Sequence, residues 1–542
     1  MKHVPLLLAL MAVLVAPIAL RPKADRGLSE EERTLVIITP HNEAIRYEFA
    51  RGFERWYLAK TGQGVRVDYR TPGGTSEIGR YVTSEYVAAF ENHWTHKLGK
   101  PWSGAVERAF ASAKVKLDET AADDTPEEAA RRAFLASDVS CKLDVFFGGG
   151  AYDFQQQANA GYLVDTGFTR EHPELFGPSG AIPQTLSGEP FWDKDGRWVG
   201  SVVSAFGIVC NTDALHRLKI AQPPARWDDL ADPRYAGQVA LANPSQSSSV
   251  TKSFEMLIQQ QMQEEVEGRR SKVEGGVLSA DAEKEAVAAG WARAMRLLQR
   301  IGANARYFTD ASTKIALDVG AGDCAAGMTI DFYGRFQSQV VARPDGTSVV
   351  QYVNAVGGTS VGVDPVGIFR GAPHADIAKD FITFVMSPEG QRLWNWKVGS
   401  PGGPDRYALR RLPVLPALYA DEFKPLRSDP EVAPYELAKN FQYHPAWTGP
   451  LFGSVGFIFR VMCVDTHHEL AAAWRALIEA GFPPGATAEF SRLEQVDYSA
   501  ASGRIRETFG PVKINEVRLA KELADGFRAQ YRRAEDLARE GK

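Results

Sequence analysis

Short runs of β-branched and aliphatic residues alternate with longer amphipathic segments through most of the chain. Residues 34–39 and 65–70 have the composition of buried strands. Between them, apolar residues recur every three or four positions, which predicts a helix over 42–62 with Asn42 as its N-cap and Gly62 as its stop. Strand, helix and strand with short connections predict an open α/β sheet, mostly parallel, in which ligands gather at the carboxyl ends of the strands.

Two polar stretches interrupt this alternation. Residues 99–137 are charged and low in large apolar side chains, and residues 259–290 include the run QQQMQEEVEGRRSKVEGG. We expect both to be surface insertions on a smaller scaffold. A terminal amphipathic helix is predicted over residues 512–541 and is expected to dock on the body of the protein.

Length and charge narrow the class of protein. A chain of 542 residues is too long for one small core, so two or more lobes are expected. The net charge of -5 and the absence of a basic block give no reason to expect nucleic acid as a partner. Four cysteines without a CxxC pair make a zinc ribbon an unsuitable interpretation, while disulfides and buried free thiols both remain open.

The N-terminus carries a basic tip and an uncharged apolar run over residues 4–20, followed by further basic residues. This pattern predicts an export signal or an N-terminal anchor within residues 1–26. We therefore expect a protein that works outside the cytoplasm, in the periplasm or an equivalent extracytoplasmic space.

Four polar loops follow predicted strands and precede predicted helices. They are TPHNE at 39–43, PGGTSE at 72–77, FFGGG at 146–150 and NPSQSSS at 243–249. The N-terminus of a helix attracts anions, and glycine lets the backbone approach a ligand closely. Each loop alone is a common turn or cap, but several together predict a binding site for an anionic group.

Six segments in order carry a family resemblance: IITPHNEAIRYEFARGFERWY, YRTPGGTSE, DVFFGGGAYDF, RWDDLADPRYAGQVALANPSQSSS, FYGRF and HADIAKDFITFVMSPEGQRLW. Together they resemble the periplasmic solute-binding proteins of ABC importers. The likeness is greatest to the branch that binds ferric ion, thiamine, phosphonates and sugar phosphates, and it covers roughly residues 34–419.

The resemblance implies the two-lobed α/β fold of type II periplasmic binding proteins, with hinge strands between lobes that close on a ligand. Lobe 1 would span residues 34–203 and resume at 364–419, and lobe 2 would span 204–363. A helical C-terminal extension, 420–542, exceeds what the family usually carries, and we expect it to extend lobe 1 and the hinge face. The expected partners are a small solute and an ABC permease with its ATPase, and we expect a monomer without cofactor or catalytic residues.

The resemblance places the ligand-binding residues on the polar loops, the crossing strand and the segment around FYGRF. The predicted ligand-binding residues are Thr39, His41, Gly74, Thr75, Ser76, Gly149, Gly150, Ser204, Ser247, Ser248, Ser249, Asp331 and Tyr333.

Three solutes remain as alternatives. Iron binders of the family have adjacent tyrosines where this chain has Phe332 and Tyr333, so we rank a small anion, such as a phosphorylated compound, above Fe³⁺ cargo held by Tyr333, His41 and Glu77, with Asp331 as a further donor. Thiamine or thiamine phosphate would need aromatic stacking and a carboxylate, which Tyr152, Trp198, Tyr333 and Asp331 could supply.

A secreted serine hydrolase is the distant alternative. GTSVG at 358–362 matches the G-x-S-x-G motif, but the following residues are extended and include a proline, so Ser360 would not precede a helix. We therefore predict a binding protein, one that hands its solute to a permease or senses it for a membrane receptor.

Overall fold

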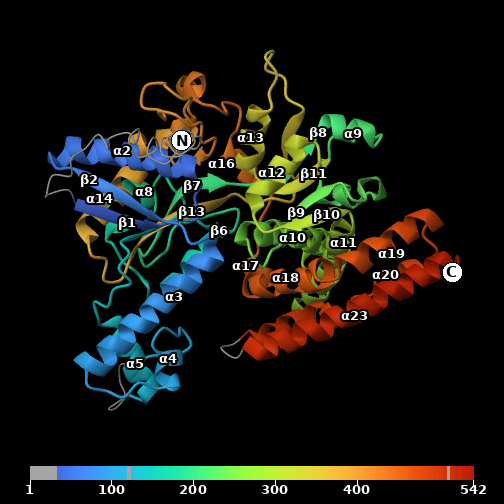
Figure 1. The fold of residues 1–542 in the computed structure, drawn as a ribbon, viewed down its shortest axis with the longest axis horizontal. Coiled ribbons are helices and arrows are strands. Elements are labelled where there is room, and N and C mark those ends of the chain that lie inside the picture. Colours follow the sequence, from blue (N-terminus) through green and yellow to red (C-terminus); the bar gives the residue numbers. More distant parts are fainter. Residues whose placement is uncertain (1–32, 119–123, 510–512) are drawn as a thin grey trace, which may run out of the picture.

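The computed structural model describes residues 33–118, 124–509 and 513–542 and contains two α/β lobes (Figure 1). Each lobe is built on its own sheet and has its own hydrophobic core. The two-lobed α/β fold that we expected is therefore confirmed. The predicted N-terminal signal or anchor at 1–26 lies outside the described residues.

The sheet of lobe 1 has seven strands in the order β14-β7-β13-β3-β1-β2, with β4 paired to β13. The strands β1, β2 and β3 are parallel, whereas β13 runs antiparallel to β3, β4 and β7. Their bounds are β1 Arg33–Ile38, β2 Val65–Arg70, β3 Val145–Phe147, β4 Leu163–Val164, β7 Val199–Ser204, β13 Gly362–Phe369 and β14 Leu412–Pro413.

The sheet of lobe 2 has five strands in the order β10-β9-β11-β8-β12. Here β9, β10 and β11 are parallel, and β8 is antiparallel to both of its neighbours. Their bounds are β8 Phe206–Asn211, β9 Val239–Ala242, β10 Ala305–Thr309, β11 Ala326–Ile330 and β12 Val350–Asn354. Both sheets are more mixed than the mostly parallel ones we expected, because the strand that enters each lobe from the other, β13 in lobe 1 and β8 in lobe 2, runs antiparallel to its neighbours.

Over the described residues, the chain crosses between the lobes three times. It first crosses at Ala205, between β7 of lobe 1 and β8 of lobe 2, and returns over residues 355–361, between β12 and β13. It crosses again between Ala438, which lies in the core of lobe 1, and Leu451, which lies in the core of lobe 2.

Helix α2 (Glu43–Thr61) follows the sequence prediction closely. The Asn42 side chain accepts a hydrogen bond from the Ile45 amide, and Gly62 ends the helix in the left-handed conformation. Phe49 and Phe53 on its buried face pack against aromatic residues of the helices α14 (Ala375–Met386) and α15 (Pro388–Asn395). This aromatic packing fixes the start of α2, and with it the preceding loop.

The two polar stretches differ from simple surface insertions. The stretch 99–137 contains α4 (Gly104–Ala109) and α5 (Pro126–Leu135), and it packs Phe110 and Phe134 against Phe90 of lobe 1. The stretch 259–290 belongs to a hairpin of two long helices, α10 (Ser248–Arg270) and α11 (Ala280–Ala303), that forms part of the lobe 2 core.

Buried glutamines explain why the second polar stretch lies inside. The Gln259 amide donates to the carbonyl oxygen of His444 at 2.8 Å and to the hydroxyl of Thr448 at 2.7 Å, and it is fully buried. A polar side chain can be buried when its hydrogen bonds are made, and the chain that makes them comes from the C-terminal extension.

The C-terminal extension divides between the lobes rather than extending only lobe 1 and the hinge face. Residues 420–438 join the core of lobe 1, whereas 451–509 and 513–538 join the core of lobe 2. The helices of the second part lie beside α10 and α11 (Figure 1). They are α18 Phe452–Phe459, α19 His467–Ala480, α20 Pro484–Phe490 and α23 Lys513–Arg539.

Among the described residues, only Pro445–Val464 is long and apolar enough to cross a membrane by length and composition. Its most apolar window is 67% buried inside lobe 2, as in the core helix of a globular domain. All four cysteines are buried and free.

Candidate functional site

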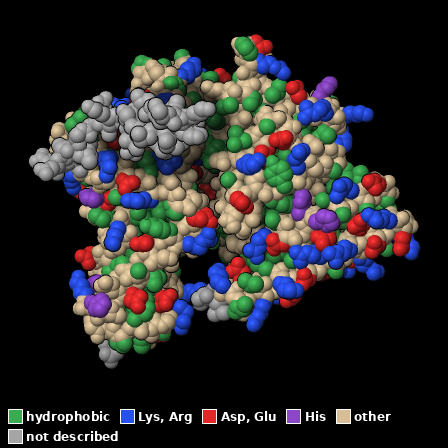
Figure 2. Space-filling model, viewed as in Figure 1, with side chains coloured by type: hydrophobic (Ala, Val, Ile, Leu, Met, Phe, Trp, Pro, Cys, Tyr) green, Lys and Arg blue, Asp and Glu red, His purple; other side chains and the backbone are tan. Residues whose placement is uncertain are grey.

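The lobes meet along a boundary that Figure 2 shows as a furrow between two bodies. Two sets of polar residues line this boundary. One set joins the N-termini of three helices, and the other surrounds a buried arginine at the hinge.

The first set brings the glycine loops of lobe 1 against the serine loop of lobe 2. The helix α3 (Thr75–Asn92) begins after Gly74, and α10 begins after Ser247; neither N-cap residue makes a side-chain capping bond. The hydroxyl groups of Thr75 and Ser248 are 2.5 Å apart across the boundary. Two helix N-termini, each with unused backbone N–H groups and a partial positive charge, therefore lie face to face.

Asp153 lies between these two helix ends, on α6 (Ala151–Ala160). One carboxylate oxygen accepts from the Gly150 amide at 3.2 Å, and the other accepts from the Ser248 hydroxyl at 3.3 Å. Burial raises the pKa of Asp153 to about 6, against the hydrogen bonds that favour its charged form. The Asp153 carboxylate thus lies between the N-termini of α3 and α10, a position that would also suit an anionic solute.

The glycines before α6 let the loop pass close to both sets. Gly148 and Gly149 have φ of +86° and +119°. A Cβ on Gly148 would lie 2.3 Å from the His41 ring, and one on Gly149 would lie 2.7 Å from the Thr75 methyl group. Only glycine permits both the conformation and the approach.

The second set is centred on Arg411, which is 1% exposed. Its guanidinium donates to the Ser204 hydroxyl at 2.6 Å and pairs with the Asp364 carboxylate at 2.7 Å. It also lies 3.2 Å from Nε2 of His41, and its Nε atom is buried without a partner. Residues from β7, β13 and the first loop thereby meet at one cation, which directly precedes β14.

These charges set the protonation of the neighbouring groups. Burial lowers the pKa of His41, so that its imidazole is neutral. Burial alone would raise the pKa of Asp364, but the charge of Arg411 and the hydrogen bonds to it outweigh burial and lower that pKa. The site therefore holds a carboxylate and a guanidinium side by side.

Tyr333 lies at the start of α13 (Asp331–Val340), next to this pair. Burial raises the pKa of its phenol to about 12, and the charges of Arg411 and Asp364 act on it with opposite signs. Within the described residues, no group hydrogen-bonds to its hydroxyl, which leaves a neutral donor at the boundary.

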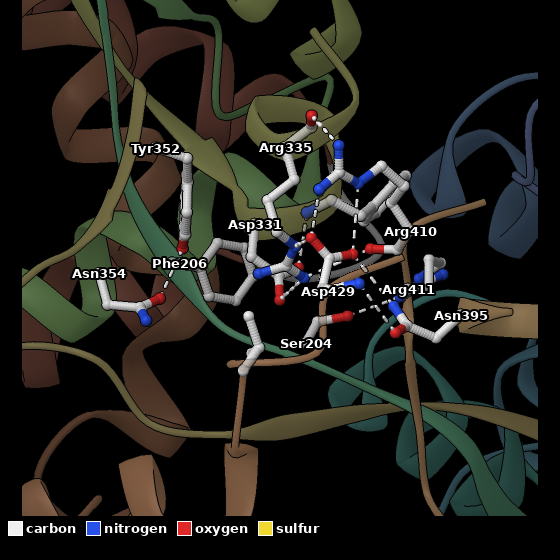
Figure 3. A network of polar contacts seen from close by, with 12 residues as sticks. Ser204, Phe206, Asp331, Arg335, Tyr352, Asn354, Asn395, Arg410, Arg411 and Asp429 are labelled. Carbon is white, nitrogen blue, oxygen red and sulfur yellow. Dashed lines mark hydrogen bonds and ion pairs between the residues drawn. The ribbon is translucent and has the colours of Figure 1, made fainter. Parts of the chain in front are cut away.

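Asp331 has a different role from the one we predicted. Its carboxylate accepts a hydrogen bond from the Phe332 amide at 2.7 Å. It also accepts one from the Arg335 guanidinium at 2.6 Å (Figure 3). Arg335 also lies 3.7 Å from Asp429, which pairs in turn with Arg410. This network of two aspartates and two arginines joins α13 of lobe 2 to the end of lobe 1, so Asp331 is committed to the hinge.

The remaining predicted residues lie in or near the boundary without a common partner. Thr39 is buried and accepts a hydrogen bond from the His41 amide, which shapes the first loop, while Ser76 lines a cavity beside the boundary. Ser249 is half-buried, and Glu77 pairs with Arg80 on the same helix. Within the described residues no group of three His, Cys, Asp or Glu side chains is placed to hold a metal ion.

Three residues of the site were missed from the sequence. They are Asp153, Asp364 and Arg411. Asp153 follows the FFGGG loop by three residues and so was open to prediction, whereas nothing in the run ALRRLP shows that Arg411 returns to the first loop.

The sequence match that decides the family covers more than half of the chain. Residues 107–402 match the profile of the bacterial extracellular solute-binding proteins. The chain belongs to this family. Family members bind solutes, which agrees with a boundary lined by polar groups of both lobes.

Individual relatives match over shorter stretches. The phosphoglycerate transport regulatory protein PgtC of Salmonella typhimurium is 27% identical over 195 residues, 36% of this chain and 40% of the relative. An uncharacterized protein of Haemophilus influenzae is 25% identical over 259 residues, 48% of this chain and 62% of the relative. The matches thus span less than two thirds of either relative.

Two solved structures of binding proteins are similar to the chain. The periplasmic binding protein AfuA of Actinobacillus pleuropneumoniae, with fructose-6-phosphate bound, is 17% identical, with 67% of this chain and 82% of AfuA covered and a TM-score of 0.44. Iron-bound HitA of Pseudomonas aeruginosa is 15% identical, with 79% of this chain and 99% of HitA covered and a TM-score of 0.46.

Proposed function

We propose that this protein captures a small anionic solute, such as a phosphorylated compound, between its two lobes and delivers it to the permease and ATPase of an ABC importer. It would work outside the cytoplasm, reached through the export signal or anchor predicted at its N-terminus. The observation that carries the proposal is the face-to-face arrangement of the uncapped N-termini of α3 and α10, with Thr75 and Ser248 in contact.

The second set of polar residues, around Arg411, also offers donors to an anion. The Tyr333 hydroxyl is a free neutral donor, and the buried Arg411 has an unused N–H. Hydrogen bonds from such groups to a charged ligand are stronger than those between neutral groups. The name of the Salmonella relative refers to phosphoglycerate transport, which points to the same class of solute over the matched residues.

Iron is a weaker candidate for the cargo. Fe³⁺ favours anionic oxygen ligands, but Asp331 is paired with Arg335, and Glu77 is paired with Arg80. A buried guanidinium, that of Arg411, lies beside His41 and acts on Tyr333. A fixed cation next to these donors opposes the binding of another cation.

The aromatic residues that we expected to hold thiamine do not converge on one site. Trp198 lies in the core of lobe 1 at 1% exposure, Tyr152 packs against Phe452, and Tyr333 belongs to the hinge set. A thiazolium ring needs these aromatic groups together with a carboxylate.

Catalysis by Ser360 is also opposed by its surroundings. The residue is 1% exposed, and its hydroxyl donates to Glu189 at 2.8 Å, within the return crossing between β12 and β13. A nucleophile needs a base and access to substrate.

Native mass spectrometry of the protein purified without denaturation tests the proposal. We expect a releasable adduct with the mass of an organic or inorganic anion, and an adduct with the mass of iron would contradict it. Isothermal titration with that anion then compares Ser248→Ala, which should weaken binding about tenfold, with Ser84→Ala on the exposed face of α3, which should not.

A further inference from the structure

A cavity of about 220 Å³ lies beside the contact between α3 and α10. Lobe 1 contributes Ser76, Tyr152 and Asp153 to its wall, and lobe 2 contributes the loop before α10 and its first turn. The third wall comes from the C-terminal extension, through α18 and residues near the start of α23. The extension thus reaches the boundary between the lobes, although it lies beyond the part of the chain that matches the family.

The wall made by the extension is mainly apolar and aromatic, with Arg460 and Glu516 as its two charged members. Phe452 packs against Tyr152 across the boundary with ring centroids 4.4 Å apart and the ring planes tilted by 32°, and Phe457 meets Phe509 edge-on at 5.4 Å. Phe452 and Phe457 are nearly buried, while Tyr152 is 40% exposed at the rim. Such a wall favours a flat apolar group, because aromatic rings stabilise one another by stacking and edge contacts in addition to burial.

Two glycines on α18 provide the space for that group. Gly453 and Gly456 lie three residues apart, so they share a face of the helix, and both line the cavity. A Cβ on Gly453 would have only one neighbour within contact range, the Phe509 ring at 4.0 Å. Any larger side chain there would project into the cavity.

The cavity also has a polar side. Ser248 at the start of α10 and Asp153 of α6 line it, so it is continuous with the proposed anion site. On the other side lies Arg460, whose guanidinium is 5.4 Å above the Phe457 ring and whose Nε atom is 3.6 Å from the Asp465 carboxylate. This side of the cavity therefore places a cation next to the aromatic wall.

We propose that the C-terminal extension adds a second subsite to the solute site, and that the solute is an anion carrying a flat apolar group about the size of a phenyl ring. The anionic end is held at the N-termini of α3 and α10, and the apolar end lies against Phe452, Phe457 and the glycine face of α18. This inference rests on the proposed anion-binding function and specifies the class of its solute.

Two phosphate esters of different substituent size test the subsite. Isothermal titration of the full chain measures the Kd for phenyl phosphate and for methyl phosphate, which bring the same anionic group. We expect phenyl phosphate to bind at least tenfold more tightly, because only its ring reaches the aromatic wall. In Gly453→Leu the ratio of the two Kd values should fall to about one, and Gly453→Ala should reduce it less.

A matched control lies on α10. Gly268 is an exposed helical glycine with nothing within 4 Å of an added Cβ, so Gly268→Leu makes the same chemical change away from the cavity and should preserve the ratio. Circular dichroism melting of all variants establishes that each is folded.

The possible outcomes distinguish the proposed aromatic subsite from the proposed anion-binding function. Equal Kd values of the two esters for the unmodified protein, or an unchanged ratio in Gly453→Leu, would overturn the subsite while the binding of both esters still supports an anion site. Failure of both esters to bind the unmodified protein would overturn the anion site and the subsite together.

Discussion

The hydroxyl groups of Thr75 and Ser248 are in hydrogen-bond contact, although one belongs to lobe 1 and the other to lobe 2. A Cβ added to the neighbouring Gly74 would lie 3.2 Å from the Gln246 carbonyl oxygen of the opposite lobe. The structure therefore describes the closed arrangement of the lobes. In a solute-binding protein, a ligand stabilises closure only by binding the closed state more tightly than the open one.

A cysteine pair tests whether this arrangement exists in solution. Thr75→Cys with Ser248→Cys should form a disulfide under mild oxidation, because the two side-chain ends already touch, and the bond should stop solute exchange. Non-reducing electrophoresis and the dissociation rate of bound solute measure both effects. Thr75→Cys alone is the control, since the four native cysteines are buried. Failure of the pair to cross-link would show that the lobes do not adopt this closed arrangement.

The ion pair of Arg411 and Asp364 gives a double-mutant prediction. Arg411→Met leaves a buried carboxylate without its cation and should lower the free energy of unfolding by about 3–5 kcal/mol. Adding Asp364→Asn removes the uncompensated charge, so the double variant should recover more than half of the loss. Urea denaturation measures all three variants. Strictly additive losses would mean that the two side chains do not interact.

The pH dependence of stability should report on Asp153. Its folded pKa of about 6 lies above the usual value of 3.8, because of burial and, to a smaller extent, the negative charge of Asp364. The folded state therefore binds more protons between these values, so this group favours folding at low pH and loses that contribution as pH rises from about 4 to 6.

Asp153→Asn should remove this dependence. We expect the variant to gain about 1–2 kcal/mol relative to the parent between pH 4 and pH 7, discounted because the residue is only half-buried. Melting temperatures of both proteins from pH 4 to 8 provide the comparison, in which titrations common to both cancel. Parallel curves would place the pKa of Asp153 near its ordinary value.

Removing the Tyr333 hydroxyl should weaken solute binding. Tyr333→Phe should cost about 1–3 kcal/mol of binding free energy, because the solute group that accepts its hydrogen bond is left unpaired. Titration with the solute recovered from the native protein gives the change in Kd. Tyr81→Phe, on the exposed side of α3, is the matched control. An unchanged Kd would remove Tyr333 from the site.

The local parts of the site could be predicted from sequence, because their cause is local. Alternating apolar and polar positions showed where strands end and helices begin, and Asn42 caps α2 as expected. The loops with Thr75 and Ser248 were chosen on the same grounds, and the structure brings them together across 173 positions of sequence. The resemblance to a two-lobed family supplied that juxtaposition, which no periodicity contains.

The parts that escaped prediction depend on partners far away in the chain. The polarity of Gln259 suggested a surface position. The sequence does not show that His444 and Thr448, far along the chain, accept its hydrogen bonds and allow it to be buried. Asp331 looked available for a ligand, but Arg335, one helical turn later, takes its carboxylate. The amphipathic pattern of the terminal helix α23 predicted a buried face. It could not predict that lobe 2, rather than lobe 1, covers that face.

The three crossings between the lobes have a mechanical consequence. Since their number is odd, β1 and α23 belong to opposite arms of the hinge, and the long axis of α23 extends away from the boundary (Figure 1). A small rotation at the hinge therefore becomes a large displacement at the far end of this helix. The distance between α2 and α23 therefore changes strongly with the angle between the lobes. Energy transfer between one fluorophore on each helix would measure the opening of single molecules.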